Sequence, residues 1–246
     1  MNGLMKLTWN ETKLLGRERS SMFFSLAFPA LLLVILGSIP GFREPVKSIG
    51  GLRAIDLYVP ILIAFAMTML ALQTVPTALA IYREKGILRR MAVTPVGPTR
   101  VLQAQMLTYL LMSIGAVATL VLVGRVAFAV PLPGQLFGFA LAIVLVSAAL
   151  GAIGLTIAAL APSGRAGNAI GTLLFFPNMF FAGLWIPRPA MPATLREIGD
   201  YTPLGAGVQA LQDATAGAWP HPLQLAVLAA YIVVFGIIAS KVFRWE

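Results

Sequence analysis

Long apolar runs alternate with short polar segments along the whole chain of 246 residues. Each run approaches the ~20 residues that an α-helix needs to cross the hydrocarbon core of a bilayer. The pattern therefore predicts an all-α, polytopic membrane protein, with one transmembrane domain over residues 1–246 and six transmembrane helices. The expected spans cover residues 22–39, 57–81, 101–124, 136–161, 169–186 and 222–243.

Composition supports this fold class. Hydrophobic residues make up 59% of the chain and charged residues only 11%, whereas about a quarter of the residues in a soluble globular domain are charged. The chain contains no cysteine, which excludes disulfides and thiolate metal sites.

The distribution of Lys and Arg predicts the orientation. Twelve of the eighteen basic residues lie at the two termini and in the polar segments 82–100 and 162–168, and six lie in the other segments. The positive-inside rule then places both termini and residues 82–100 in the cytoplasm. The net charge of +9 is mainly topological, and we expect no nucleic-acid partner.

Two segments outside the spans have amphipathic patterns. Residues 4–19 predict an interfacial helix with Trp9 at headgroup depth, although an ordinary basic flank would have similar residues. Between the last two spans, Ala193–Ile198 and Leu204–Ala214 predict two short helices that cap or dip into the outer face; the alternative is a surface loop.

The cytoplasmic stretch 82–98, YREKGILRRMAVTPVGP, is too charged for a membrane span and too short for a domain. Ile87, Leu88 and Met91 lie on one helical face, and Pro95 and Pro98 are expected to end the helix. A short amphipathic helix between two spans favours a contact surface for a soluble partner. The alternative is an anchor that faces anionic lipid.

Enzyme chemistry finds little support. The single histidine, His221, lies between two prolines, and neither a zinc-protease HExxH nor a nucleotide-binding GxxxxGK[ST] pattern is present. We therefore expect no catalytic residue, no metal site and no cofactor bound by this chain.

The predicted spans contain few ionisable residues, which disfavours an ion-coupled secondary transporter. The uncharged polar side chains either line a translocation path or join helices by hydrogen bonds. The candidates for such a path, together with one aromatic residue, are Gln73, Thr74, Thr77, Asn178 and Phe181.

Two segments resemble a known family. REKGxLRRMxVTPV, at residues 83–96, resembles the ERExGTLRRLLxTPV signature of ABC (ATP-binding cassette) type-2 export permeases, particularly the daunorubicin-resistance-like membrane subunits. FFAGLWIPRPAMPATLREIGDYTPL, at residues 180–204, resembles the family's pattern at the end of span five. The chain departs from the signature at Ile87, where the family often has Thr, and mildly at Lys85.

The resemblance implies a permease in a bacterial plasma or inner membrane, with outer re-entrant helices at about Pro189–Leu211. Its partners would be two copies of a separate ABC ATPase, which bind ATP and Mg²⁺, a second permease subunit, identical or homologous, and membrane lipid. The resemblance further implies an ATPase-docking site made of Arg83, Glu84, Lys85, Gly86, Ile87, Leu88, Arg89, Arg90, Met91 and Pro95.

Two functions follow as hypotheses. The first is the permease subunit of an ATP-driven exporter that moves an amphipathic or lipid-like compound, such as a drug, antibiotic or lipid, outward. In this hypothesis residues 82–98 form a stiff lever continuous with span two. Ile87, Leu88 and Met91 fill an apolar groove on the ATPase, while Glu84 and the arginines fix the register by charge pairing. The alternative is a non-transporting membrane anchor or assembly factor that recruits a cytoplasmic partner through the same residues.

Overall fold

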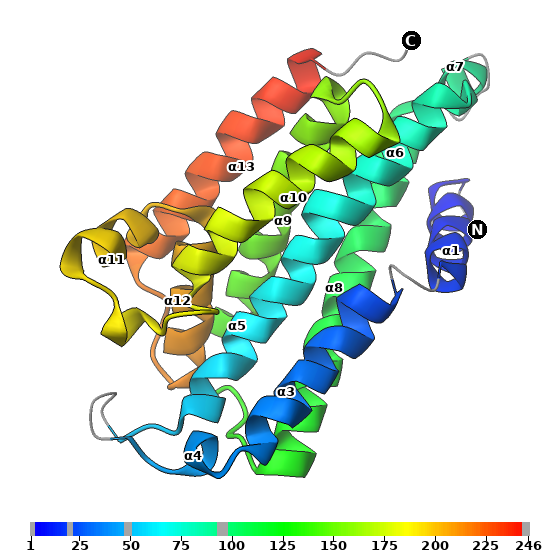
Figure 1. Cartoon of the computed structure of the whole chain (residues 1–246). Helices are drawn as coiled ribbons and strands as arrows, with labels where there is room; N and C mark the ends of the chain where they lie inside the picture. Colours follow the sequence, from blue (N-terminus) through cyan, green and yellow to red (C-terminus); the bar gives the residue numbers. More distant parts are fainter. Residues whose placement is uncertain (1–2, 19–21, 47–50, 93–97, 243–246) are drawn as a thin grey trace.

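The computed structural model describes residues 3–18, 22–46, 51–92 and 98–242. These residues form helices arranged in a bundle, with one isolated bridge between Pro45 and Arg53 (Figure 1). The α-helices are α1 (Gly3–Arg17), α3 (Phe28–Ser38), α4 (Pro40–Arg43), α5 (Ala54–Met69), α6 (Val75–Glu84), α7 (Ile87–Ala92), α8 (Pro98–Phe128), α9 (Leu136–Leu160), α10 (Gly164–Ala182), α11 (Ala193–Asp200), α12 (Pro203–Thr215) and α13 (Pro222–Val242). Two π-turns, η1 (Phe23–Ala27) and η3 (Leu70–Thr74), and a 3₁₀ turn, η4 (Arg188–Ala190), complete the described elements.

Four helical stretches are long and apolar enough to cross a membrane: Ala54–Glu84, Thr99–Phe128, Leu136–Leu160 and Pro222–Val242. They contain the spans predicted at 57–81 and 101–124, and they cover the spans predicted at 136–161 and 222–243 except for the last residue of each, of which residue 243 lies outside the described residues. The first predicted span is a shorter apolar helix, Phe23–Ser38. The total of six spans therefore stays a prediction.

The span predicted at 169–186 is displaced in the structure. Its helix, α10, begins at Gly164, because the Ser163 side chain accepts a hydrogen bond from the backbone N–H of Ala166 and caps the helix. It ends at Ala182, because Gly183 adopts a φ of +88°, which closes a helix in the left-handed conformation.

The segment before α13 is more than a surface loop. Leu204, Val208 and Leu211 of α12 are fully buried, and α12 packs against α5, α9, α10 and α13. Small residues allow this close approach: a Cβ added to Gly207 would lie 2.7 Å from the Val146 side chain. The two predicted short helices are confirmed as α11 and α12, and the alternative of a simple surface loop is wrong for α12.

The long helix that begins at Ala54 contains a π-turn, η3, near its middle. Pro76 follows this turn and cannot donate a backbone hydrogen bond, so the helical ladder is interrupted here. Two glycines of neighbouring helices touch the turn. A Cβ added to Gly154 would lie 2.2 Å from the carbonyl oxygen of Ala71, and a Cβ added to Gly171 would lie 1.8 Å from the carbonyl oxygen of Leu72.

We predict that Gly154→Ala and Gly171→Ala each destabilise the protein. The added methyl would collide with backbone, which cannot move aside as a flexible side chain can, and overpacking of this kind costs about 1–3 kcal/mol. The midpoint of thermal unfolding in detergent should fall for both variants.

The matched control for these variants is Gly236→Ala on α13, where an added Cβ meets nothing within 4 Å. Its midpoint should stay the same or rise, because Ala is the better helix former. Equal midpoints for all three variants would contradict the close contact at η3.

Candidate functional site

Three successive side chains at the carboxyl end of α6 contact three different elements. Successive residues of an α-helix point about 100° apart, so Tyr82, Arg83 and Glu84 reach toward different neighbours. Tyr82 contacts α1, Arg83 contacts the end of α9, and Glu84 contacts the start of α10. These contacts lie at the base of the predicted docking segment.

Tyr82 is bonded to a carboxylate on the N-terminal helix. Its hydroxyl lies 2.7 and 2.9 Å from the two carboxylate oxygens of Glu11, and the side-chain amide of Gln105 on α8 donates to the same carboxylate at 2.6 Å. Burial raises the pKa of the Glu11 carboxyl, and the hydrogen bonds from Tyr82 and Gln105 oppose that rise.

Arg83 caps the carboxyl end of α9. Its guanidinium donates to the carbonyl oxygens of Ala158 at 3.3 Å and Ala159 at 3.5 Å, and also to that of Ala161. The last carbonyl groups of a helix lack donors within the helix and carry its partial negative charge. The Arg83 guanidinium supplies both the missing hydrogen-bond donors and a positive charge next to this partial negative charge.

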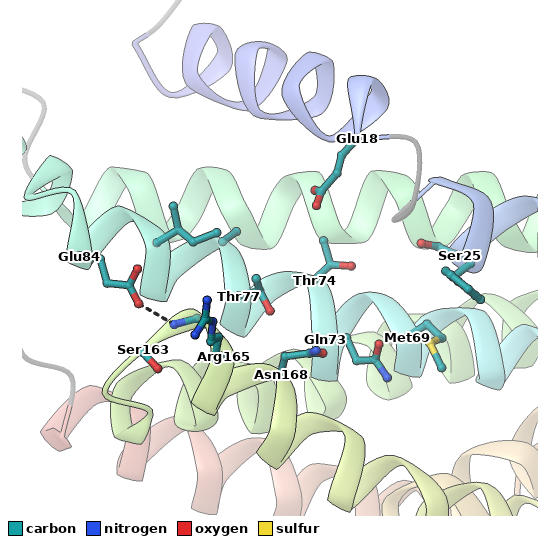
Figure 2. A pocket seen from close by; sticks show the side chains of 14 residues that line it. Glu18, Ser25, Met69, Gln73, Thr74, Thr77, Glu84, Ser163, Arg165 and Asn168 are labelled. Carbon is teal, nitrogen blue, oxygen red and sulfur yellow. Dashed lines mark hydrogen bonds between the residues drawn. The ribbon is translucent and has the colours of Figure 1, made fainter.

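Glu84 binds the amino end of a helix, whereas Arg83 binds a carboxyl end. Its carboxylate accepts a hydrogen bond of 2.8 Å from the backbone N–H of Gly164, the first residue of α10 (Figure 2). A negative charge is favourable at this end, where the first N–H groups are free and carry partial positive charge. Arg83 and Glu84 therefore fix the turn between α9 and α10 against the end of α6.

The predicted lever is interrupted, not continuous with span two. α6 ends at Glu84, and Gly86 adopts a φ of +64°, which favours glycine. α7 then begins at Ile87. Pro98 starts α8 instead of ending α7, and Pro95 lies outside the described residues.

The docking residues divide into buried and exposed groups. Leu88 is fully buried within the chain, which corrects the expectation that it fills a groove on a partner. A charged substitution there would disturb the fold itself. Ile87 and Met91 are half-buried, and Lys85, Arg89 and Arg90 are exposed. Arg90 also donates to the Lys85 carbonyl oxygen at 3.3 Å.

A cavity of about 860 Å³ lies beside these contacts, between Glu18, η1, the η3–α6 stretch and the start of α10 (Figure 2). Three of the predicted path residues, Gln73, Thr74 and Thr77, line it. The other lining residues are Glu18, Phe24, Ser25, Met69, Ala78, Ile81, Glu84, Ser163, Gly164, Arg165 and Asn168.

Two predicted path residues are not among those that line the cavity. The Asn178 amide donates to the Leu174 carbonyl oxygen of its own helix at 2.9 Å, and Phe181 forms an edge-to-face pair with Phe180. Conversely, Arg165 and Asn168 were missed, because the sequence GRAGN reads as a turn. The sequence did contain a signal for a helix here: Ser163 is a favourable N-cap residue, and Arg165 and Asn168, three positions apart, would then lie on the same side of the helix.

Comparison with known families decides the identity. The family model described as ABC-2 type transporter matches residues 3–215. The chain belongs to the ABC-2 type transporter family. A search of curated proteins finds no match.

This membership makes the chain a multi-pass membrane permease subunit, the transmembrane component rather than the ATPase. The family generally works with a separate ABC ATPase. Within the described ranges, no group of three His, Cys, Asp or Glu side chains lies together as a metal site would need.

The half-buried Glu11 carboxyl predicts a pH dependence of stability. A raised pKa in the folded state means that the folded protein binds the proton more tightly than the unfolded chain. The contribution of Glu11 to the free energy of unfolding is therefore fully present below pH 4.5, the ordinary pKa of a Glu carboxyl. That contribution is lost as the pH rises through the higher pKa of the folded state. Glu11→Gln lacks this loss, so its unfolding midpoint should gain on that of the wild type across that window. A constant difference between the two proteins would contradict the assignment.

Proposed function

We propose that this ABC-2 permease is the membrane subunit of an ATP-driven exporter for amphipathic or lipid-like compounds. The cavity is the observation that carries the proposal. Its volume of about 860 Å³ is within the range of sites for drug-sized ligands, about 300–1,000 Å³. Its position beside the predicted docking segment supports the proposal, because a ligand bound there would lie next to the part that a partner ATPase would move.

The lining supports an amphipathic ligand. Phe24, Met69 and Ile81 supply apolar surface, and Gln73 and Asn168 supply uncharged hydrogen-bonding groups. Such a mixture suits a ligand with an apolar body and a few polar groups. The resemblance to daunorubicin-resistance subunits, carried by residues 83–96, favours a drug or antibiotic, and a lipid has the same amphipathic character.

The partners follow from the same proposal. Two copies of an ABC ATPase would bind ATP and Mg²⁺, and a second permease subunit, identical or homologous, would complete the transporter. The exposed cations Lys85, Arg89 and Arg90 are the groups that would meet an acidic surface on the ATPase, because complementary charges set register and speed association. The direction of transport would be outward, from the cytoplasm or the inner leaflet.

The docking surface can be tested by charge reversal. Arg89→Glu with Arg90→Glu should abolish association with a co-expressed ABC ATPase while the permease still inserts and unfolds at its normal midpoint, because both side chains are exposed. The measurement is copurification of the two proteins and ATP hydrolysis in liposomes.

Arg196→Glu, an exposed residue on the expected outer side, is the control and should leave association intact. If the double variant still binds the ATPase and responds to ligand, the docking assignment fails. If an ATPase binds but daunorubicin and fluorescent phospholipid neither move nor alter its turnover, the anchor or assembly function gains support.

The cavity assignment predicts a contrast between two amides. Gln73→Phe should fill part of the cavity and lower transport of whichever of the two probes the wild type moves, by about tenfold or more, with ATPase association unchanged. Asn178→Ala changes an amide that is not among the lining residues and should transport normally. Equal losses in both variants would place the path elsewhere.

A further inference from the structure

The N-terminal helix α1 is attached to the bundle through Glu11, a contact that the sequence of the helix does not predict. It packs along α8 (Figure 1), and most of its length is exposed or half-exposed. Glu11 is the acidic residue of α1, and it points into the bundle rather than to solvent. Its two partners, Tyr82 and Gln105, belong to different helices.

Those two partners flank the predicted docking segment. Tyr82 lies at the end of α6, where residues 82–98 begin, and Gln105 lies on α8 shortly after they end. One carboxylate thus joins the two arms of the loop and the N-terminal helix. A second contact beside it, from the Thr108 hydroxyl to the Thr8 carbonyl oxygen at 3.4 Å, keeps α1 in the same register on α8.

A carboxylate is a costly way to attach a helix. Burying it forfeits hydration, and apolar residues of similar volume would often hold two helices at least as firmly. What the carboxylate adds is direction, because it must meet donors on both α6 and α8 at hydrogen-bond distance. Stability alone does not account for Glu11.

We propose that Glu11 is a positioning residue that fastens α1 to both arms of the docking segment, so that α1, α6 and α8 move as one unit when a partner acts on residues 82–98. This inference rests on the proposed function for the partner's action, but the attachment of α1 can be tested without it. On the other side of α6, Arg83 and Glu84 hold α9 and α10. The base of the loop would then transmit motion to both sides.

The attachment is tested with spin labels, which the cysteine-free chain accepts without background. Labels at Asn10→Cys on α1 and Ser240→Cys on α13, both exposed, report the position of α1 in lipid nanodiscs. The wild type and Glu11→Gln, which keeps an oxygen acceptor for Tyr82, should each give one narrow distance distribution. Glu11→Ala should broaden it; an unchanged distribution would overturn the proposal.

Transmission is tested in the assembled complex with its ATPase. Glu11→Ala should lower transport per ATP hydrolysed, for the probe that the wild type moves, by about tenfold, the effect expected from losing hydrogen bonds to a charged group. Tyr82→Phe, which removes only the hydroxyl, should lower it less. The double variant should be no worse than Glu11→Ala alone, because both changes remove the same interaction.

Two further variants distinguish a loss of coupling caused by displacement of α1 from one caused by general destabilisation of the protein. Asn10→Ala, an exposed neighbour on the same helix, should match the wild type. In Glu11→Cys with Gln105→Cys, a short bis-methanethiosulfonate cross-linker, which attaches to each Cys through a disulfide with loss of sulfinate, should restore coupling, and a thiol reductant, which cleaves those disulfides, should remove it again. If α1 is displaced but coupling is normal, or if the cross-link restores nothing, the proposal is wrong. If no ATPase associates at all, the proposed function fails while the spin labels still decide the attachment of α1.

Discussion

The opposed charges of Arg83 and Glu84 at the end of α6 are the constraint on which the packing of α6 against α9 and α10 depends at that end of the bundle. The chain turns from α9 to α10 within a few residues, so a helix end with partial negative charge lies next to one with partial positive charge. Arg83 and Glu84, adjacent in sequence, meet these two ends with charges of the right sign. Neither contact would be favourable with the two residues exchanged.

The face of α6 that carries Glu84 also bounds the cavity. Thr77, Ile81 and Glu84 recur at helical spacing along it, and each lines the cavity opposite the first turns of α10. The hydrogen bond from Gly164 to Glu84 therefore sets how closely α6 and α10 approach at that end. A ligand in the cavity and a partner on the docking segment would act on one shared contact.

Much of this arrangement could be predicted from the sequence, and the remainder has identifiable physical reasons. The apolar runs predicted four spans that the structure describes as long apolar helices, and the pattern at 193–214 predicted α11 and α12, because burial and periodicity are local signals. Leu88 was misjudged because an apolar residue looks the same whether it packs within its own chain or against another. Glu11 went unnoticed because its partners lie 71 and 94 residues away, a pairing that no local pattern encodes.

The placement of rigid and irregular backbone follows from these contacts. α6 is a regular helix of ten residues that begins directly after the π-turn at Leu70–Thr74 and ends with Tyr82, Arg83 and Glu84. A force applied beyond Gly86 first meets this stiff segment, since regular helices resist bending while their hydrogen bonds are intact. The nearest interruption of the ladder is η3, and there Gly154 and Gly171 press against the backbone without side chains between. Glycine at these two positions permits close contact of α9 and α10 with the backbone of the turn. Gln73 and Thr74 of the same turn line the cavity, so the irregular turn, the two close helix contacts and one wall of the cavity occupy a single short stretch of the chain.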